Sequence, residues 1–395
     1  MIDDGEDITM CEPLMVAEES PHYSELADLA FDLASKSNAL ASSLPEAMQT
    51  SLASTVRTMN CYYSNLIEGH DTHPISADRA MRGDLSADPE ERNLQLEAVA
   101  HISVQKWIDE GGLTTHPVSP ESIREIHQRF CADLPPELLV VANPETGASI
   151  EVVGGEYREH HVAVGQHVPV SPGAVPRFMT HLHKRYNVAG KVTAVLSAAY
   201  AHHRIAWVHP FIDMNGRVVR MVSHAMLQDS VRSQGLWSVS RGLARQVDQY
   251  KLQMARADEQ RRGDRDGRGN LSEERLAGFA RFFLKVSIDQ VEFMSGLMKP
   301  KELQDRVMAW TLREMADRKL PKSADIVMRL TFASGEVERK EVEKVLGITD
   351  RGARKITKAL VDAGALISDS PRAPLRLNFS PKLAHEWMPG LFPAE

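Results

Sequence analysis

The residues best suited to chemistry lie at positions 209–220, in the stretch HPFIDMNGRVVR. Apolar residues recur at helical spacing after Asn215 and predict a helix that begins near it: Val218, Val222, Ala225 and Met226. Residues 192–207 are also apolar and helix-forming, so the stretch is predicted to be a loop between two helices. A helix start leaves backbone N–H groups without acceptors and carries the positive end of the helix dipole. The loop is therefore expected to bind an anionic phosphate.

Five residues of this loop fit phosphate chemistry. Gly216 lets the backbone approach a ligand closely. Arg217 and Arg220 are three residues apart, so both guanidinium groups can hold one polyphosphate from the same helix face. Asp213 is a hard oxygen ligand of the kind that Mg²⁺ accepts when phosphates supply further ligands. His209 is the usual type of residue for taking a proton from a hydroxyl near neutral pH.

At these positions the sequence resembles the Fic family, whose motif is His-x-Phe-x-(Asp/Glu)-Gly-Asn-Gly-Arg-x-x-Arg. Every defined position matches except one, where Met214 replaces the first glycine. The resemblance implies an adenylyltransferase that moves AMP from Mg-ATP to a hydroxyl of a target protein and releases pyrophosphate. It implies these roles: His209 as general base, Asp213 as the Mg²⁺ ligand, Asn215 and Gly216 as the anion hole, Arg217 on the outer phosphates, Arg220 on the γ-phosphate and Phe211 as the anchor of the loop in the core.

Met214 is a departure from the family pattern. A glycine at this position can adopt a backbone conformation that methionine resists, or can leave room beside the α-phosphate. Three consequences stay open: an altered choice of nucleotide, weak catalysis, or loss of transfer with retained binding.

Residues 45–67 carry one apolar stripe at four-three spacing, which predicts an amphipathic helix that Gly69 ends. Ser64 and Glu68 lie four residues apart at its end and therefore share a helix face. The stretch resembles the inhibitory motif (Ser/Thr)-x-x-x-Glu-(Gly/Asn) of the Fic subclass in which the inhibitor precedes the catalytic loop. The resemblance implies that Glu68 pairs with Arg220 and leaves ATP in an unproductive pose. In some relatives this glutamate also positions water for removing AMP. The alternative is a capped helix end with a surface glutamate.

Residues 149–170 combine glycines with alternating apolar residues, which predicts a β-hairpin. In Fic proteins a flap in this place holds the target by strand addition, a mode that does not depend on the target's sequence. The residues of this expected flap are Gly155, Tyr157, His161, Val162 and Val164. The alternative is an ordinary surface hairpin. Residues 243–256 predict a helix that resembles the segment bordering the nucleotide base, where Tyr250 is the candidate contact.

The 395 residues indicate two or three domains, because one ordinary domain is shorter. We expect a mobile acidic leader at residues 1–20, a helical region with the inhibitory helix at 21–115, a Fic catalytic core at 116–299 and a further domain at 301–395. A hydrophobic content of 43% with 25% charged residues is typical of a globular protein, and no apolar run could span a bilayer. With only three cysteines and no basic-then-apolar leader, we expect a cytoplasmic protein without disulfides, and a homodimer.

The expected C-terminal domain has the order helix, turn, helix, strand, loop, strand, which resembles a winged helix-turn-helix domain. Its second helix carries four basic residues on one face: Arg351, Arg354, Lys355 and Lys358. This face could contact the phosphates of DNA. The alternative is a module for protein contact or dimerisation.

The fold expected from these patterns is mainly α: a Fic-type helical core with a small β-hairpin flap, followed by the winged helix domain. Three functions compete. The first is a glutamate-inhibited protein adenylyltransferase that uses ATP and Mg²⁺. The second is a nucleotide-sensing DNA-binding regulator with weak or lost transfer, and the third is a transferase with another phosphate-linked donor.

Overall fold

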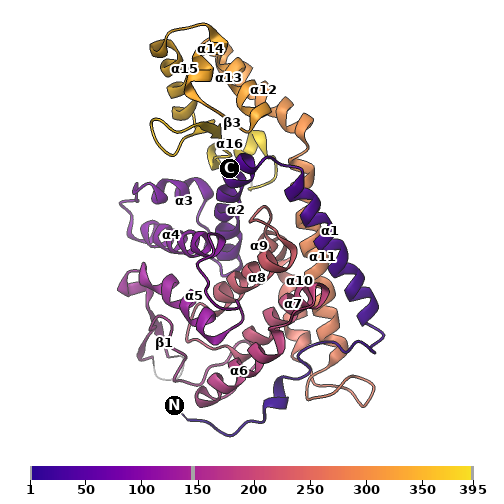
Figure 1. Ribbon diagram of the computed structural model, residues 1–395. Coiled ribbons are helices and arrows are strands. Elements are labelled where there is room, and N and C mark those ends of the chain that lie inside the picture. Colours follow the sequence, from indigo (N-terminus) through magenta and orange to yellow (C-terminus); the bar gives the residue numbers. More distant parts are fainter. Residues whose placement is uncertain (1, 144–146, 393–395) are drawn as a thin grey trace. The chain divides into compact units, whose positions relative to one another are not determined.

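A computed structural model describes residues 2–143 and 147–392, and it is mainly helical, as predicted (Figure 1). By its internal contacts the chain divides into two compact units. The first unit comprises Met1–Asn38, Asn60–Ser233 and Ser238–Val291, and the second comprises Ala39–Met59, Gln234–Trp237 and Glu292–Glu395. Among the described residues, no helix is both long and apolar enough to cross a membrane.

The first unit is built around α7 and α8, which pack against each other and flank the motif loop. Helix α6 packs on α7, and α4 and α5 pack on α8. The C-terminal two thirds of α7 is almost wholly buried, which explains why its apolar residues are not confined to one stripe. The elements up to the motif loop are η1 (Ile8–Cys11), α1 (Tyr23–Ser42), α2 (Glu46–Ile67), α3 (Pro74–Met81), α4 (Pro89–Asp109), α5 (Pro120–Ala132), η2 (Pro136–Leu138), β1 (Val140–Ala142), β2 (Ser149–Glu151), η3 (Pro172–Ala174), α6 (Val175–Tyr186) and α7 (Lys191–Val208). After the loop follow α8 (Asn215–Val231), α9 (Val239–Arg245), α10 (Val247–Ala257) and α11 (Glu273–Leu297).

The predicted inhibitory helix is α2, and it ends where its sequence indicated. Gly69 adopts a φ of +89° just after the helix, a conformation that glycine reaches without strain. Its N–H donates to the Leu66 carbonyl at 3.1 Å, and the N–H of His70 donates to the Asn65 carbonyl at 3.0 Å. These bonds close the helix end and fix the direction in which Glu68 leaves it.

Residues 71–88 contain α3, because Pro74 starts the helix, His73 caps it and Ala77 and Ala80 are buried. Two local expectations for the first unit differ from the structure. The hairpin is not formed within residues 149–170: β2 pairs with the earlier strand β1, and only a single bridge joins Val164 to His167. The helix expected at 243–256 is two helices, α9 and α10, which meet at Gln246.

The leader expected to be mobile is docked on the first unit in its described part, residues 2–20. Figure 1 shows this segment running alongside α6. Cys11, Leu14 and Val16 are buried, and the Tyr186 hydroxyl donates to the Leu14 carbonyl at 2.8 Å. The acidic composition of the segment concealed these apolar anchors.

The second unit contains a three-stranded antiparallel sheet with strand order β3-β5-β4. Trp310, Phe379 and Trp387 form its aromatic core. The hydroxyls of Ser51 and Thr55, on the first part of α2, donate to the carbonyls of Leu377 and Phe379. Its elements after α11 are α12 (Pro300–Ala316), α13 (Ala324–Ser334), β3 (Glu336–Val337), α14 (Arg339–Leu346), α15 (Asp350–Asp362), β4 (Leu366–Ile367), β5 (Leu375–Leu377) and α16 (Pro381–Trp387). The order helix, turn, helix, strand, strand is present from α14 to β5, while β3 and α16 were not predicted, and the identification as a winged helix remains a prediction.

Candidate active site

The motif loop is bounded by two residues with left-handed backbone. His209 ends α7 with φ 50° and ψ 65°, and Met214 precedes α8 with φ 65° and ψ 9°. A left-handed conformation costs a non-glycine residue about 1–2 kcal/mol. Met214 therefore adopts the conformation that a glycine would adopt without strain. Its side chain is buried, with its sulfur 3.6 Å from Sγ of Cys131.

Phe211 and Asn215 close the loop through a reciprocal pair of hydrogen bonds. The Phe211 N–H donates to Oδ1 of Asn215 at 3.0 Å, and Nδ2 of Asn215 donates to the Phe211 carbonyl at 2.8 Å. The Phe211 ring is fully buried and stacks on His127, with ring centroids 3.9 Å apart. Phe211 thus lies in the core, as expected of the anchor. The Asn215 amide holds the loop, so its contribution to an anion hole is limited to its backbone.

Arg158 fixes the backbone at His209. The buried guanidinium donates to the carbonyls of His209 at 2.7 Å and His160 at 3.0 Å, and also to that of Val170. Arg158 therefore ties the segment that follows β2 to the motif loop, a role that the sequence did not reveal. The His209 imidazole is partly exposed. Desolvation, aided by the positive charge of Arg158, lowers the pKa of His209 to about 4.

Glu68 lies over the first turn of α8. A Cβ placed on Gly216 would collide with Oε1 of Glu68. The same oxygen accepts a hydrogen bond from Nη2 of Arg220 at 2.5 Å, and Arg220 also donates to Oγ of Ser64 at 2.8 Å and to the Ser64 carbonyl at 3.0 Å. Burial raises the pKa of Glu68, but the Arg220 charge outweighs it and holds this pKa below its usual value. A carboxylate thus lies at the helix start where a phosphate was expected.

Arg217 is held by a second carboxylate that the sequence analysis missed. It forms a buried ion pair with Glu97 of α4, and its guanidinium lies 5.3 Å from the centroid of the Phe130 ring. The other oxygen of Glu97 lies 2.7 Å from Nδ1 of His70. The chain segment at residues 68–70 therefore reaches both motif arginines, one through Glu68 and the other through His70 and Glu97.

Tyr250 lies beneath Arg220 in a buried polar network. Its hydroxyl is 2.8 Å from Nε2 of His202, whose Nδ1 is 2.8 Å from Oγ of Ser223. Burial raises the pKa of Tyr250 to about 12, and a hydrogen bond with Arg220 opposes that rise. Tyr250 therefore helps to hold the Arg220 side chain in place. A contact of Tyr250 with a nucleotide base remains a prediction.

Asp213 lies at the start of α8 beside this site. Its Oδ1 accepts the N–H of Met214 at 2.6 Å, which leaves its second oxygen for another partner. Burial raises the pKa of the Asp213 carboxyl. Among the described residues, no group of three or more His, Cys, Asp and Glu side chains could hold a metal ion by itself. Any Mg²⁺ here would need phosphate oxygens in addition to Asp213.

Residues 117–227, which span α5 to most of α8, match the model of the Fic/DOC family. This part of the chain is a Fic/DOC domain. Relatives named "Protein adenylyltransferase Fic" from Drosophila persimilis and Drosophila melanogaster are 26% and 25% identical over 168 residues, which is 42% of this chain. The aligned region covers 30% and 31% of those relatives, so the chain spans about a third of their length.

Solved structures support the fold. A Fic family protein from Desulfovibrio desulfuricans G20 superposes with a TM-score of 0.53 at 15% identity and covers 92% of this chain and 98% of its own. Fic-1 (aa134–508) from C. elegans gives a TM-score of 0.51 at 18% identity, covering 70% of this chain and 72% of its own. Glu68 and Glu97, which hold the motif arginines, both precede the matched Fic/DOC domain.

The expected flap of the Fic/DOC domain divides into packed and exposed residues. The Gly155 N–H donates to Nδ1 of His127 at 2.9 Å, and the Tyr157 ring lies 5.9 Å from that of Phe211, so both residues support the motif loop. His161 and Val164 are exposed and Val162 is half-buried, and their role in target docking remains a prediction.

The four basic residues expected to contact DNA are all exposed on α15, outside the Fic/DOC domain: Arg351, Arg354, Lys355 and Lys358. Arg354 pairs with Asp350 at 2.9 Å and Lys358 pairs with Asp362 at 2.7 Å. The local positive charge is therefore partly neutralised.

Proposed function

We propose that this chain is a protein adenylyltransferase that transfers AMP from ATP to a hydroxyl of a protein target, and that Glu68 restrains it. The observation that carries the proposal is the position of the Glu68 carboxylate against Gly216 and Arg220. A carboxylate at a helix start takes the place to which a phosphate binds readily. The names of the Drosophila relatives support AMP as the transferred group.

In the proposed reaction a bond forms between the target's hydroxyl oxygen and the α-phosphorus of ATP. The bond from that phosphorus to the bridging oxygen breaks, and pyrophosphate leaves. His209 accepts the hydroxyl proton, because a pKa of about 4 leaves its imidazole neutral at pH 7. A bound triphosphate would raise this pKa toward neutrality and make His209 a better base. The backbone N–H groups at the start of α8 would stabilise the charge on the α-phosphate.

Asp213 fits Mg²⁺ through the oxygen that Met214 does not use. The ion would neutralise phosphate charge as the leaving group departs. Arg217 and Arg220 would hold the outer phosphates once their carboxylate partners release them. Removal of AMP from a modified target would use the same site: water positioned on Glu68 would attack the phosphorus of the bound AMP group, and the target's hydroxyl and free AMP would leave.

Restraint in this proposal has two parts, because each motif arginine has its own acidic partner. Glu68 holds Arg220, and Glu97 holds Arg217. Repulsion between these carboxylates and a triphosphate would oppose productive binding. Glu97 is thus proposed as a second restraining residue, located on α4 rather than on the inhibitory helix.

The test is incubation of the chain with Mg²⁺ and α-labelled ATP. Glu68→Gly should increase label on the protein well above the wild-type level, and adding His209→Ala should abolish it. Absence of label from the wild type and from a folded Glu68→Gly variant would refute the transferase proposal. A panel of other nucleotides and CDP-linked donors, read by intact mass, would then test a transferase with another donor.

A second candidate is a nucleotide-sensing DNA-binding regulator, favoured by the exposed cations of α15 and the strained Met214. It predicts ATP binding without transfer. Duplex binding by the full chain should weaken with salt, and a variant with Arg351→Ala and Lys355→Ala should lower the logarithmic salt slope by about 2. The matched control is Lys301→Ala on α12, which should leave the slope unchanged. No DNA binding at low salt would eliminate this candidate.

A further inference from the structure

The N-terminal acidic segment (residues 2–7) lies across the start of α6 and is held by backbone contacts. The Gly173 N–H donates to the Ile2 carbonyl at 2.7 Å, and the Asp4 N–H donates to Oγ of Ser171 at 3.0 Å. The approach at Gly173 is so close that a Cβ there would lie 2.6 Å from the Asp3 nitrogen. These backbone contacts require a glycine at position 173 and do not depend on the side chains of the segment.

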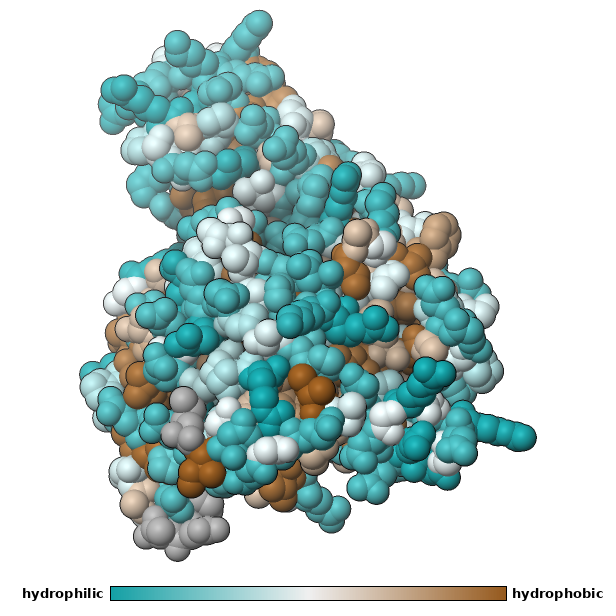
Figure 2. Space-filling view, turned by 60° about the horizontal axis from the view of Figure 1, so that its bottom comes forward, coloured by the Kyte–Doolittle hydropathy of each residue, from teal (hydrophilic) through white to brown (hydrophobic). Residues whose placement is uncertain are grey.

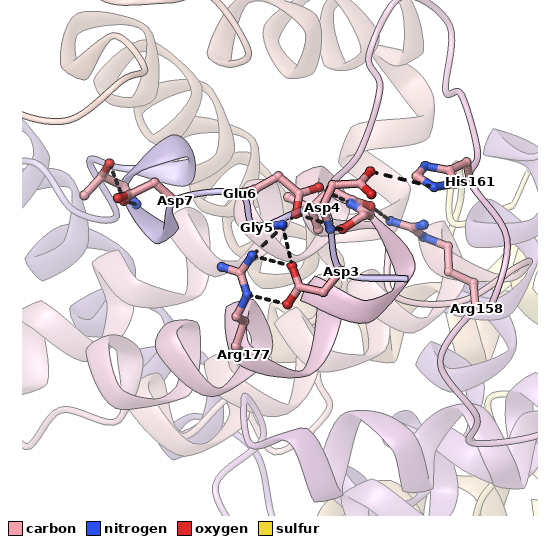
Figure 3. A network of polar contacts seen from close by, with 11 residues as sticks. Asp3, Asp4, Gly5, Glu6, Asp7, Arg158, His161 and Arg177 are labelled. Atoms are coloured by element: carbon pink, nitrogen blue, oxygen red, sulfur yellow. Dashed lines mark hydrogen bonds and ion pairs between the residues drawn. The ribbon is translucent and has the colours of Figure 1, made fainter. Parts of the chain in front are cut away.

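Acidic side chains supply the remaining contacts, as Figure 3 shows. Arg177 donates to both carboxylate oxygens of Asp3, at 2.9 and 3.0 Å, and reaches Glu6 at 3.4 Å. The Ser171 hydroxyl donates to Glu6 at 2.7 Å, and the Ser171 N–H donates to the other oxygen of that carboxylate. Asp4 lies 3.9 Å from Nε2 of His161. The hydrogen bond from Arg177 lowers the pKa of Asp3 to about 2, so the carboxylate stays charged at physiological pH.

Hydrophobic burial does not hold this segment. Ile2, its only large apolar residue, is 69% exposed. The face that comes forward in Figure 2 is mainly hydrophilic, with hydrophobic residues in small scattered groups. By contrast, Cys11 and Leu14 of the following residues are buried, so the chain is anchored there. The contacts of residues 2–7 can therefore open while the chain beside them stays in place.

The segment lies next to the expected target-docking residues of the proposed transferase. His161, which faces Asp4, belongs to the exposed part of the flap. Arg158 contacts the carbonyls of both His160 and the catalytic His209, and the charge of Glu6 acts on its guanidinium. A peptide bound in the place of residues 2–7 would thus lie beside the expected target-docking residues, on the side from which a target would reach His209.

We propose that His161, Ser171, Gly173 and Arg177 form a docking site for an acidic segment of the protein target, and that residues 2–7 occupy this site in cis. The proposal rests on the proposed function for the identity of the target as substrate, but the docking chemistry stands on the contacts alone. The site offers a cation, a hydroxyl, a backbone N–H and the positive end of a helix to an acidic peptide. Release of residues 2–7 would open it.

The test uses the full chain with a weakened cis segment, carrying Asp3→Asn, Asp4→Asn and Glu6→Gln. A fluorescent peptide with the sequence of residues 2–9, IDDGEDIT, is added in trans and its anisotropy is measured without nucleotide. A tethered segment has an effective concentration on the order of millimolar, so it should exclude a micromolar peptide from the wild-type chain. We expect the peptide to bind the triple variant at least tenfold more tightly than the wild type, with affinity that falls as salt rises.

Further substitutions in the triple variant identify the site. Gly173→Ala places a methyl group where the peptide backbone lies, and Arg177→Ala removes the main cation, so each should weaken peptide binding at least tenfold. Arg185→Ala, an exposed arginine at the other end of α6, is the matched control and should have no effect. A peptide with asparagine and glutamine in place of its acids should not bind.

Equal binding to the wild type and the triple variant, binding that ignores Gly173→Ala and Arg177→Ala, or no binding would each overturn the docking proposal. Absence of peptide binding would mean that residues 2–7 only stabilise the fold at this position. Because peptide binding is read without ATP, these outcomes are independent of whether AMP is transferred. Failure of transfer with intact peptide binding would refute the proposed function and leave the docking site standing.

Discussion

Replacing Glu68 with glutamine should destabilise the protein without nucleotide and strengthen its response to ATP. The Arg220 side chain is only 1% exposed, whereas that of Glu68 is 35% exposed. Breaking a fully buried ion pair costs about 3–5 kcal/mol, and breaking a surface pair costs about 0–1 kcal/mol. Arg220 keeps its two hydrogen bonds to Ser64 in the variant. We therefore expect Glu68→Gln to lower the free energy of unfolding by about 2 kcal/mol, between these limits.

The measurement is thermal unfolding with and without Mg²⁺ and a non-hydrolysable ATP analogue. A loss of about 2 kcal/mol lowers the Tm of a unit of this size by roughly 4–8 °C. A nucleotide at about one hundred times its Kd adds about 2.7 kcal/mol, which would offset the loss. The γ-phosphate gains Arg220 in the variant but competes with Glu68 in the wild type, so the analogue should raise the Tm of the variant more.

Glu125→Gln is the matched control, because Glu125 forms an exposed pair with Arg129 within α5. It should change the Tm by less than about 2 °C with or without nucleotide, since such a pair contributes at most about 0.5 kcal/mol. Equal analogue-induced shifts in the wild type and Glu68→Gln would refute the reasoning. They would mean that Glu68 does not compete with nucleotide for Arg220.

Glu97→Gln in a Glu68→Gly background should free Arg217 and so lower the KM for ATP several-fold in a steady-state transfer assay. An unchanged KM would mean that Glu97 has only a structural role. Because burial lowers the pKa of His209 to about 4, kcat/KM for ATP should be level between about pH 6 and 8, and a midpoint near 6.5, the ordinary pKa of an imidazole, would contradict this assignment. Between about pH 4 and 6.5 the unfolded state binds more protons at His209 than the folded state does, so the free energy of unfolding should rise with pH. Urea denaturation should show a smaller rise in His209→Gln. Met214→Gly should relieve about 1 kcal/mol of backbone strain but lose about 2 kcal/mol of stabilisation from side-chain burial. The free energy of unfolding should therefore fall by about 1 kcal/mol in the same urea assay, and a rise would disprove the reasoning.

Sequence patterns predicted the elements that build the site, because those elements depend on local information. The apolar spacing after Asn215 placed the start of α8 at the observed residue, and Gly69 correctly ended α2. The Fic resemblance also predicted the pairing of Glu68 with Arg220, although the two residues are 152 positions apart. That prediction came from a motif and not from periodicity, which carries no information about distant partners.

Most of the features that the sequence did not predict are pairings between elements, chiefly of charged residues distant in the chain. Glu97 lies among apolar residues of α4, and nothing local distinguishes a carboxylate buried against Arg217 from one in solvent. The acidic N-terminus was expected to be mobile for the same reason, since its partner Arg177 is distant in sequence. The pairing of β2 with β1 was missed because the strands are three residues long and neither contains a buried residue.

The acidic partners of the site all precede the Fic/DOC domain at residues 117–227, and the cations they hold lie within it. The two arginines of the proposed triphosphate site are buried, and a buried arginine without a partner is costly when ATP is absent. Glu68 and Glu97 meet that need, and in the proposed function they take the places that phosphates would occupy. In this view the residues that stabilise the empty site are necessarily those that oppose ATP, so inhibition and stability have one physical origin. Variants that free the arginines should accordingly gain activity at the expense of stability, and ATP should restore the latter.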